Sequence, residues 1–421
     1  VTVQPFIFDF FEELAAPEFA RVSPDPRTFT ADEFATMEFS GSGDVTGAVV
    51  PTNDVLVPPG NQANASSSGC EASDFAPASA TEPQVALVQR GTCTFAAKAL
   101  NAEAAGYDAV IIFNEGQAGR QDVLFGTLGD ARPSIPVIGT EFDIGAELYT
   151  QSQAGPVTVH VATSTRITPT PTSNVIADSP GGRADRTVVV GAHLDSVPEG
   201  PGINDNGSGS AAILEIAEAM SEPAITPTNR VRFAFWGAEE SGLVGATQYV
   251  AGLSAKELRS IALNLNFDMV GPPNYVRFVY DGDGSDTPVA GPNGSGHIEQ
   301  VFLDYFASQG LPTEPTAQDG RSDYFAFTAV GIPAGGLFTG AEGVKTPEQA
   351  AVYGGTAGVA YDPCYHQACD TIGNVSETAV DEMSDAAAHA TLTFAMTTSA
   401  ANGTARASST ATTQLGHLAA A

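Results

Sequence analysis

The chain has 421 residues, of which 49 are acidic and 17 basic, and its formal net charge is -32 at pH 7. So much negative charge repels phosphate backbones and anionic lipid surfaces, which argues against nucleic-acid binding and membrane association. A chain of this length has room for two or three domains. Because hydrophobic residues still make up 43% of it, we expect a folded protein that is extracellular or salt-adapted.

In chain order, the first element is Val1 to Phe8, whose alternating apolar and polar residues predict a strand. Residues 9–36 mix short helical patterns with prolines and indicate no clear unit. We expect residues 1–37 to be a strand and a connection that belong to the domain beginning near residue 164. The sequence starts with Val and shows neither a signal peptide nor a membrane-spanning apolar run, so we expect a processed chain.

Four cysteines, Cys70, Cys93, Cys364 and Cys369, allow three combinations of disulfides. As zinc ligands, Cys364 and Cys369 would need a second cysteine pair nearby, and the sequence offers none. We therefore favour disulfides, which indicate an oxidising compartment outside the cell. The two local pairings, Cys70 with Cys93 and Cys364 with Cys369, fit the division into domains that the rest of the sequence indicates.

From Glu38 onward, strands and helices alternate with Gly-rich turns. The run Arg90 to Phe95 (RGTCTF), followed by a helix and by the strand Asp108 to Phe113, resembles the hallmark of the protease-associated (PA) domain. The resemblance spans residues 38–163 and implies an inserted, β-rich PA domain stapled by Cys70 and Cys93. Such domains accompany peptidases as lids or substrate-contacting modules and carry no catalytic residues of their own.

A Thr- and Pro-rich stretch at 164–174 predicts a linker, and the segments Asn174 to Ala177 and Thr187 to Val190 flank a turn as in a hairpin. Beyond it, strands alternate with helices, which favours an α/β fold with a mixed, mostly parallel sheet covered by helices on both faces. We expect further strands at 231–236, 261–267 and 334–338, and helices at 207–220, 243–253, 298–308, 324–330 and 377–396. The polar, low-complexity residues 398–421 predict a disordered tail.

Histidines and carboxylates follow the predicted strands of this second domain or lie in its loops. Because the carboxyl ends of parallel strands share one edge of a sheet, we expect these side chains to meet there. They are His193, Asp205, Glu239, Glu240, Asp268 and His366. Two histidines and four carboxylates are what a pair of zinc ions and one general base require.

Each of these residues also has a simpler structural explanation. Glu239 and Glu240 open a helix, where acids commonly balance the helix dipole. Asp268 alone could merely end a strand, and His366 alone could be an ordinary loop residue. Their convergence on one edge of the sheet favours the metal site. The remaining histidines, His160, His297, His389 and His417, lack an acidic partner pattern and are predicted to be surface or core residues.

Six motifs, GAHLDS, NDNGSG, AEESGL, NFDMVG, GRSDYFAF and CYHQACDT, occur in this order between residues 174 and 397. They resemble the co-catalytic di-zinc aminopeptidases, the bacterial leucyl aminopeptidase family of the transferrin-receptor and zinc-peptidase superfamily. The resemblance implies a peptidase domain at 164–397 with two zinc ions. It also implies a cis peptide bond after Asp205.

The resemblance assigns a role to each converging residue. It implies that His193 and Asp268 hold one zinc, that Glu240 and His366 hold the other, and that Asp205 bridges both. A hydroxide held by the zinc pair would attack the scissile carbonyl, with Glu239 as the general base. By the same resemblance Asp195 orients His193, as acids commonly do for metal-bound imidazoles, and Tyr365 stabilises the oxyanion.

A peptide with a free amino terminus is the substrate that this resemblance implies. Glu239 and Asp268 would lie near its ammonium group. By family position Arg321 orients the peptide, while Met269, Gly320 and Phe338 form an apolar pocket that we expect to prefer leucine-like first residues. We expect a secreted monomer.

Other functions fit the sequence less well. A carboxypeptidase of the same superfamily would need basic residues for the substrate carboxylate, and these are scarce near the motifs. A catalytically dead binding module would have lost metal ligands, whereas all five ligands and the base are present. Calcium is a further possibility at Asp281 to Asp286 (DGDGSD), but the segment lacks the closing Glu of an EF-hand, which favours a plain turn.

Overall fold

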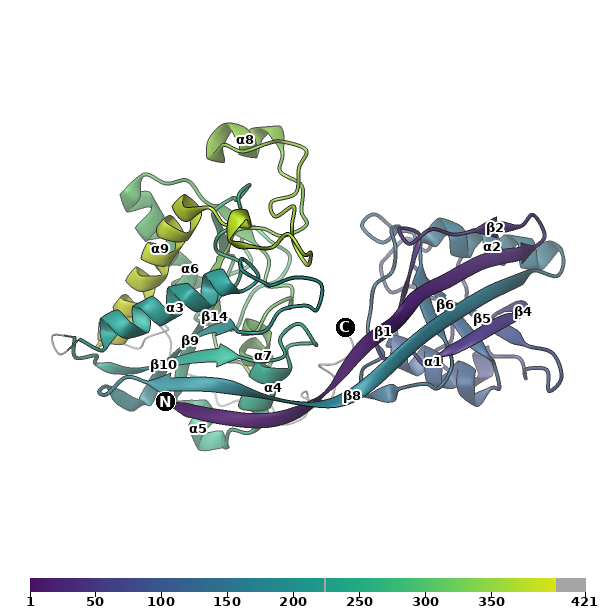
Figure 1. Cartoon of the computed structure of the whole chain (residues 1–421), viewed down its shortest axis with the longest axis horizontal. Helices are drawn as coiled ribbons and strands as arrows, with labels where there is room; N and C mark the ends of the chain where they lie inside the picture. The colour runs from purple at the N-terminus through teal and green to yellow at the C-terminus, as the bar shows by residue number, and fades with distance from the viewer. Residues whose placement is uncertain (223–224, 399–421) are drawn as a thin grey trace. The chain divides into compact units, whose positions relative to one another are not determined.

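The computed structural model describes residues 1–222 and 225–398, which divide into two compact units (Figure 1). The first unit contains Val1–Phe8 and the described residues from Thr170 onward, and the second contains Asp9–Pro169. Two long strands, β1 (Thr2–Ser23) and β8 (Thr158–Asp178), each run from one unit into the other. Apart from Thr398, the tail predicted at 398–421 lies outside the described residues.

The N-terminal segment differs from the prediction, since only Val1–Phe8 belongs with the first unit. Phe19, Phe29 and Phe34 are buried in the core of the second unit, and the rings of Phe19 and Phe29 stack with centroids 4.3 Å apart. Residues 9–37 therefore pack with the second unit. Strand β1 continues to Ser23, well beyond the predicted end at Phe8, and neither of its two prolines, Pro5 and Pro17, interrupts it.

The Thr- and Pro-rich stretch at 164–174 is part of β8 and not a linker. Threonine favours strands, because its branched side chain packs well on a pleated surface. Pro169 and Pro171 fall between the part of β8 that pairs with β4 and the part that pairs with β10. There the missing N–H groups interrupt neither of those two ladders.

The first unit contains a mixed, mostly parallel sheet, as predicted. Its strand order is β13-β12-β14-β11-β9-β10-β8. The central strands β14 (Ala334–Phe338), β11 (Ile261–Phe267), β9 (Arg183–His193) and β10 (Asn229–Trp236) are parallel. The short strands β12 (Phe278–Tyr280) and β13 (Glu314–Thr316) lie at one edge, and on the other side β8 runs antiparallel to β10 and also pairs with β1.

The predicted hairpin between 174–177 and 187–190 is wrong, because β10 lies between β8 and β9. Residues Thr187 to His193 are all buried. A strand so completely buried needs neighbours on both sides, and β10 and β11 provide them. The half-exposed end of β8 instead pairs with β10.

Helices cover both faces of this sheet (Figure 1). On one face α3 (Gly207–Met220), α6 (Ser295–Gln309) and α9 (Glu377–Met396) share a core with Val188 and Val190. On the other face α4 (Val244–Ala251), α5 (Ala255–Ser260) and α7 (Tyr324–Thr328) pack with Val189 and Trp236. The remaining helix is α8 (Pro347–Tyr353). None of the helices in the described ranges is long and apolar enough to cross a membrane.

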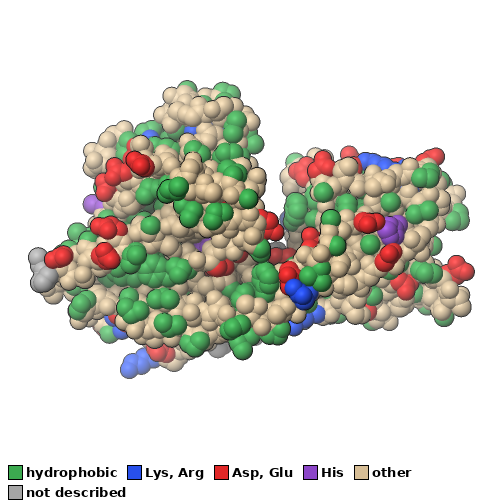
Figure 2. All heavy atoms as spheres, viewed as in Figure 1, with side chains coloured by type: hydrophobic (Ala, Val, Ile, Leu, Met, Phe, Trp, Pro, Cys, Tyr) green, Lys and Arg blue, Asp and Glu red, His purple; other side chains and the backbone are tan. Residues whose placement is uncertain are grey.

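In the second unit the hydrogen-bonded strand order continues from β8 as β8-β4-β5-β6-β7-β3. Four of its strands, β4 (Gly43–Pro51), β5 (Gln84–Gln89), β6 (Ala109–Phe113) and β7 (Val137–Thr140), are parallel. Strands β2 (Arg27–Thr28) and β3 (Phe34–Thr36) complete it, with helices α1 (Phe95–Ala104) and α2 (Phe142–Ala154). Acidic side chains are spread over the visible surface of each unit, and basic ones are few (Figure 2).

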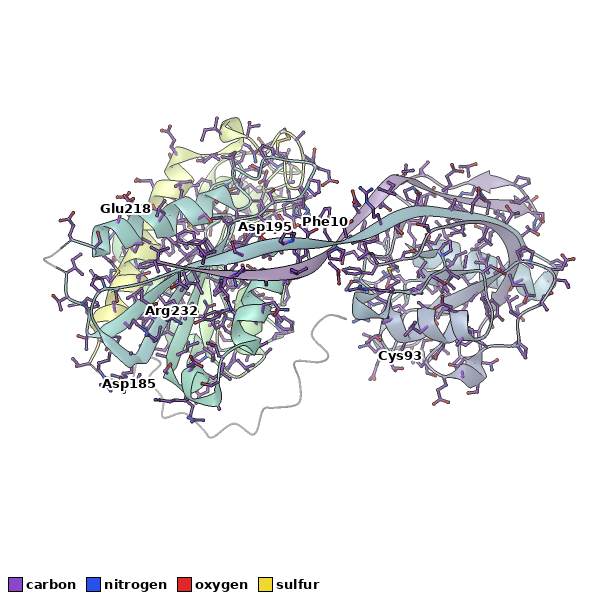
Figure 3. The ribbon with its side chains drawn as sticks, turned by 60° about the horizontal axis from the view of Figure 1, so that its bottom comes forward. Phe10, Cys93, Asp185, Asp195, Glu218 and Arg232 are labelled. Carbon is purple, nitrogen blue, oxygen red and sulfur yellow. A yellow bond between two sulfur atoms is a disulfide. The ribbon has the colours of Figure 1, made fainter. Side chains whose placement is uncertain are left out.

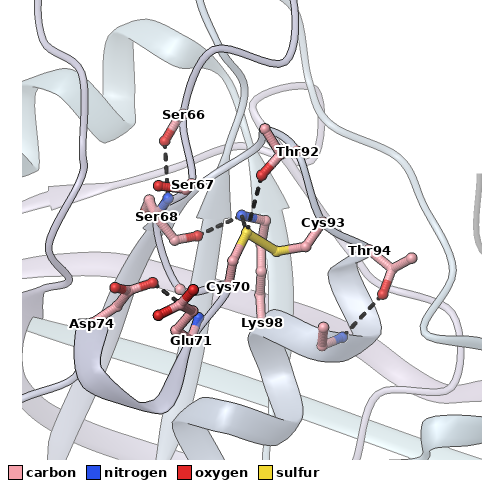
Figure 4. Close-up of a disulfide and its surroundings, with 12 residues drawn as sticks. Ser66, Ser67, Ser68, Cys70, Glu71, Asp74, Thr92, Cys93, Thr94 and Lys98 are labelled. Atoms are coloured by element: carbon pink, nitrogen blue, oxygen red, sulfur yellow. Dashed lines mark hydrogen bonds between the residues drawn. A yellow bond between two sulfur atoms is a disulfide. The ribbon is translucent and has the colours of Figure 1, made fainter.

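The predicted disulfide between Cys70 and Cys93 is present in this unit (Figure 4). It lies beside Lys98 on α1, whose side chain is completely buried. The Lys98 ammonium donates a hydrogen bond to the carbonyl of Ser68, and its Nζ lies 3.7 Å from Sγ of Cys70. Burial lowers the pKa of Lys98 to about 8, although the charge of Asp74 partly opposes this shift.

Candidate active site

The residues predicted to converge do meet at the carboxyl ends of the parallel strands in the first unit. His193 is the last residue of β9, and Asp268 directly follows β11. Glu239 and Glu240 lie just beyond the end of β10. The other two come from loops, Asp205 from the one that leads into α3 and His366 from the one that follows α8.

Asp205 lies between the two histidines. Its Oδ1 is 3.2 Å from Nε2 of His193, and its Oδ2 is 3.2 Å from Nε2 of His366. A second carboxylate approaches each imidazole: Asp268 Oδ1 lies 3.1 Å from His193 Nε2, and Glu240 Oε2 lies 3.0 Å from His366 Nε2. Glu239 Oε2 is 4.0 Å from His193 Nε2. The arrangement forms two adjacent groups that share Asp205.

These groups fit divalent cations better than hydrogen bonds. The buried Nε2 of His366 and Oε1 of Glu240 have no hydrogen-bond partner in the described part of the chain, despite the short contacts around them. His193 directs Nδ1 at the carbonyl oxygen of Asp195, 3.1 Å away, so Nδ1 donates a proton there and Nε2 is the ring nitrogen that could bind a cation held among the carboxylates. A lone pair and carboxylates converging on one point are a donor set suited to zinc.

The charges in the site also favour a bound cation. Burial lowers the pKa of His193, but the carboxylates of Asp268, Glu239 and Asp205 outweigh it and raise that pKa well above its ordinary value. For His366, Asp205 and Glu240 likewise overcome burial and raise the pKa to about 10. Four carboxylates around two imidazoles carry excess negative charge, which bound cations would balance.

Asp195 positions both His193 and the glutamate pair (Figure 3 labels Asp195). We expected its side chain to orient His193, but the carboxylate lies 3.9 Å from the imidazole Nδ1, and the backbone carbonyl makes the closer contact. The carboxylate oxygens accept hydrogen bonds from the backbone N–H groups of Glu239, at 3.0 Å, and Glu240, at 3.3 Å. One residue thereby connects the ends of β9 and β10.

The loop that carries Asp205 is held by residues that the sequence analysis did not assign. The Asp370 carboxylate accepts hydrogen bonds from the backbone N–H groups of Asn204 and Asp205. The peptide bond from Asp205 to Asn206 is cis, as expected. Ser322 was also missed: its hydroxyl donates to Oδ2 of Asp268 at 2.6 Å. Ser322 lies in the motif GRSDYFAF and Asp370 in the motif CYHQACDT, so membership of these motifs could have pointed to both residues.

Tyr365 and His366 lie in a loop closed by the predicted disulfide between Cys364 and Cys369. The two rings stack with centroids 3.8 Å apart, so the tyrosine supports the imidazole. Burial, together with the charge of Asp205, raises the pKa of Tyr365. The phenol therefore keeps its proton at neutral pH and can donate a hydrogen bond.

A pocket opens beside the cluster and includes Tyr365, Arg321, Met269 and Phe338 among its lining residues. Gly320 does not line it. Its backbone N–H donates to the hydroxyl of Tyr324, and its φ of 92° favours glycine at this turn. Other lining residues that the sequence analysis did not single out are Tyr280, Thr316, Ala317, Asp319 and Ala341.

The DGDGSD segment forms a turn around Asp281. The carboxylate of this residue accepts hydrogen bonds from backbone N–H groups, including those of Gly284 at 2.8 Å and Thr287 at 2.6 Å. Asp283 and Glu299 lie close to it. The backbone contacts account for the buried charge of Asp281, in agreement with the predicted turn.

Comparison with known sequences agrees with both units. Residues 174–391 match peptidase family M28, and residues 45–148 match the PA domain. An aminopeptidase of Pseudomonas aeruginosa is 47% identical over 401 residues, which cover 94% of this chain and 73% of that protein. Leucine aminopeptidase 2 of Trichophyton rubrum is 44% identical over 332 residues, or 79% of this chain and 66% of that protein.

Solved structures of similar fold lead to the same family. An aminopeptidase from Aneurinibacillus has a TM-score of 0.67 and 26% identity, covering 92% of this chain and 82% of that chain. A zinc aminopeptidase from Bacillus subtilis has a TM-score of 0.56 and 25% identity, covering 92% and 83%. On its sequence, its fold and its polar cluster, the chain belongs to peptidase family M28 as an aminopeptidase with a PA domain.

Proposed function

We propose that this chain is a secreted, zinc-dependent aminopeptidase that binds two zinc ions and releases apolar, leucine-like residues from the amino termini of peptides. The single observation that carries the zinc pair is Asp205, which directs one carboxylate oxygen at each of two imidazoles. His193 and Asp268 would hold one zinc, and His366 and Glu240 the other. When bound, the zinc ions supply an activated water and a positive charge beside the scissile carbonyl.

Glu239 is the proposed general base. It is 8% exposed, and burial raises its pKa well above the ordinary glutamate value, although His193 opposes that shift. A raised pKa suits a carboxylate that takes a proton from the attacking water and then gives it to the leaving amine. Tyr365, which keeps its proton, would donate a hydrogen bond to the oxygen of the carbonyl under attack.

Substrate orientation follows from where charge and apolar surface lie in the pocket. Glu239 and Asp268 are acids at its inner end, where the ammonium group of a free amino terminus would be favoured. Met269, Tyr280 and Phe338 supply apolar surface for the first side chain. A carboxypeptidase would need a free cation, but Arg321, the one basic residue among the described lining residues, is paired with Glu342.

The test compares leucine p-nitroanilide with its N-acetylated form and counts zinc by elemental analysis. We expect hydrolysis of the free amine only, with two zinc ions per chain that runs as a monomer on a sizing column. Equal hydrolysis of the blocked substrate would contradict the aminopeptidase proposal. One zinc per fully active chain would contradict the paired site.

A further inference from the structure

We propose that Glu342 controls how the enzyme treats the residue after the scissile bond: by pairing with Arg321 it disfavours substrates with a free carboxylate there, such as dipeptides. This inference rests on the proposed aminopeptidase activity and adds a specificity-determining residue to it. The carboxylate of Glu342 lies 2.8 Å from Nη1 of Arg321.

The pocket has a closed inner end and an exposed rim. Met269 is 3% exposed and Tyr280 is 6% exposed, whereas the side chains of Arg321 and Glu342 are each 56% exposed. A peptide whose amino terminus lies against the buried acids can leave only through the exposed side. The rim residues therefore face the second residue of the substrate and the rest of the peptide beyond it.

The carboxylate of a dipeptide belongs to that second residue, so it would reach this rim. An unpaired arginine binds carboxylates well, because its planar guanidinium can donate two parallel hydrogen bonds. Glu342 already accepts from this guanidinium, and Asp319, a further acid, also lines the pocket. With the guanidinium engaged in this way, an incoming carboxylate has to displace Glu342 before it can bind Arg321. A longer peptide or an amide presents no charge at that point and escapes the penalty.

The measurement is the ratio of kcat/KM for Leu-Gly to that for Leu-Gly amide. Glu342→Gln is expected to raise this ratio about fivefold at low ionic strength, since exposed charge pairs are worth little more. Salt screens such exposed charges, so the gain should shrink in about 0.5 M salt. Glu342→Asp keeps the negative charge and should keep a ratio close to that of the wild type.

Two further variants isolate the local pair. Glu348→Gln removes the same charge from an exposed position on α8 and should leave the ratio unchanged, which tests for an effect of net charge. In an Arg321→Gln background, adding Glu342→Gln should raise the ratio by less than twofold, because no guanidinium remains to be released.

The results that would overturn the role of Glu342 differ from those that would overturn the aminopeptidase proposal. An unchanged ratio in Glu342→Gln, or the same fivefold rise in the Arg321→Gln background, would overturn the role of the pair. If the zinc-loaded wild type cleaves neither Leu-Gly nor its amide, the aminopeptidase proposal itself fails. The ratio is read within one variant, so differences in zinc content or folding between variants do not affect it.

Discussion

Nε2 of His366 lies 3.2 Å from Oδ2 of Asp205, although the two residues come from loops at opposite ends of the first unit's sequence. The other oxygen of Asp205 has the same separation from His193. A carboxylate that contacts two imidazoles, one through each oxygen, has the geometry of a bridging ligand. The first two predictions separate the ligands from the base.

Replacing Glu239 by Gln should abolish most turnover without removing metal. Gln keeps the shape of the side chain but cannot accept a proton, and a positioned base contributes about 100- to 10,000-fold in rate. We expect kcat for leucine p-nitroanilide to fall at least about 100-fold while the zinc content stays at two. Activity near that of the wild type would exclude Glu239 as the base.

His366→Ala should lose zinc, because it removes one of the two imidazoles around Asp205. Elemental analysis after dialysis would show less than the wild-type content. The matched control is His160→Ala, since His160 also lies 3.0 Å from an aspartate, Asp44, but in the second unit. Equal zinc in both variants would remove His366 from the ligand set.

Chelation should lower the thermal stability of the first unit as well as its activity. Without cations, the clustered carboxylates lack the charge that balances them, and any ligand that binds only the folded state stabilises it by mass action. Calorimetry with and without a chelator should show one transition moving to lower temperature and returning when zinc is added. A profile that chelation leaves unchanged would contradict a metal site in this cluster.

The disulfide between Cys364 and Cys369 should matter for zinc retention, because it closes the loop that carries Tyr365 and His366. In the chain-entropy model, a disulfide that closes a loop of this size stabilises the folded state by about 2 kcal/mol. We expect the Cys364→Ser and Cys369→Ser double variant to release zinc to a competing chelator at a lower chelator concentration. The corresponding variant of Cys70 and Cys93, in the second unit, should release it as the wild type does.

Lys98 should give the second unit an alkaline pH dependence. Burial lowers its folded-state pKa to about 8, while an unfolded lysine titrates near about 10.4. Between these values the unfolded chain binds the additional proton, so the free energy of unfolding rises with pH across this window. Denaturant titrations from about pH 7.5 to about pH 10.5 should show that rise, and Lys98→Met should flatten it. An identical rise in the variant would assign it to other groups.

The sequence predicted the longer elements of the first unit and the convergence of its polar residues, because both depend on local pattern, but it missed the short elements β12, β13, α5 and α8. His193 and Asp268 end apolar strands, and parallel strands end at one edge. The pairing of β8 with β10 was not predictable in this way, since neighbours in a sheet need not be neighbours in sequence. Nor was the bond from Ser322 to Asp268, because loop conformation decides which hydroxyl reaches a carboxylate.

The extent of the second unit was also missed, for a related reason. Phe19, Phe29 and Phe34 have no periodic pattern that would distinguish one core from the other, and only their packing shows where they belong. Likewise, the threonines of β8 resemble a linker by composition, although the same residues are good strand formers.

The long strands β1 and β8 give the PA-containing unit a modular connection to the rest of the chain. Because β1 pairs with β8, the backbone enters and leaves that unit along adjacent strands. A tight turn from Phe8 to Thr170 would excise the insertion without touching any loop that supplies a zinc ligand. Exchange of this module would therefore leave every residue of the candidate active site in the chain.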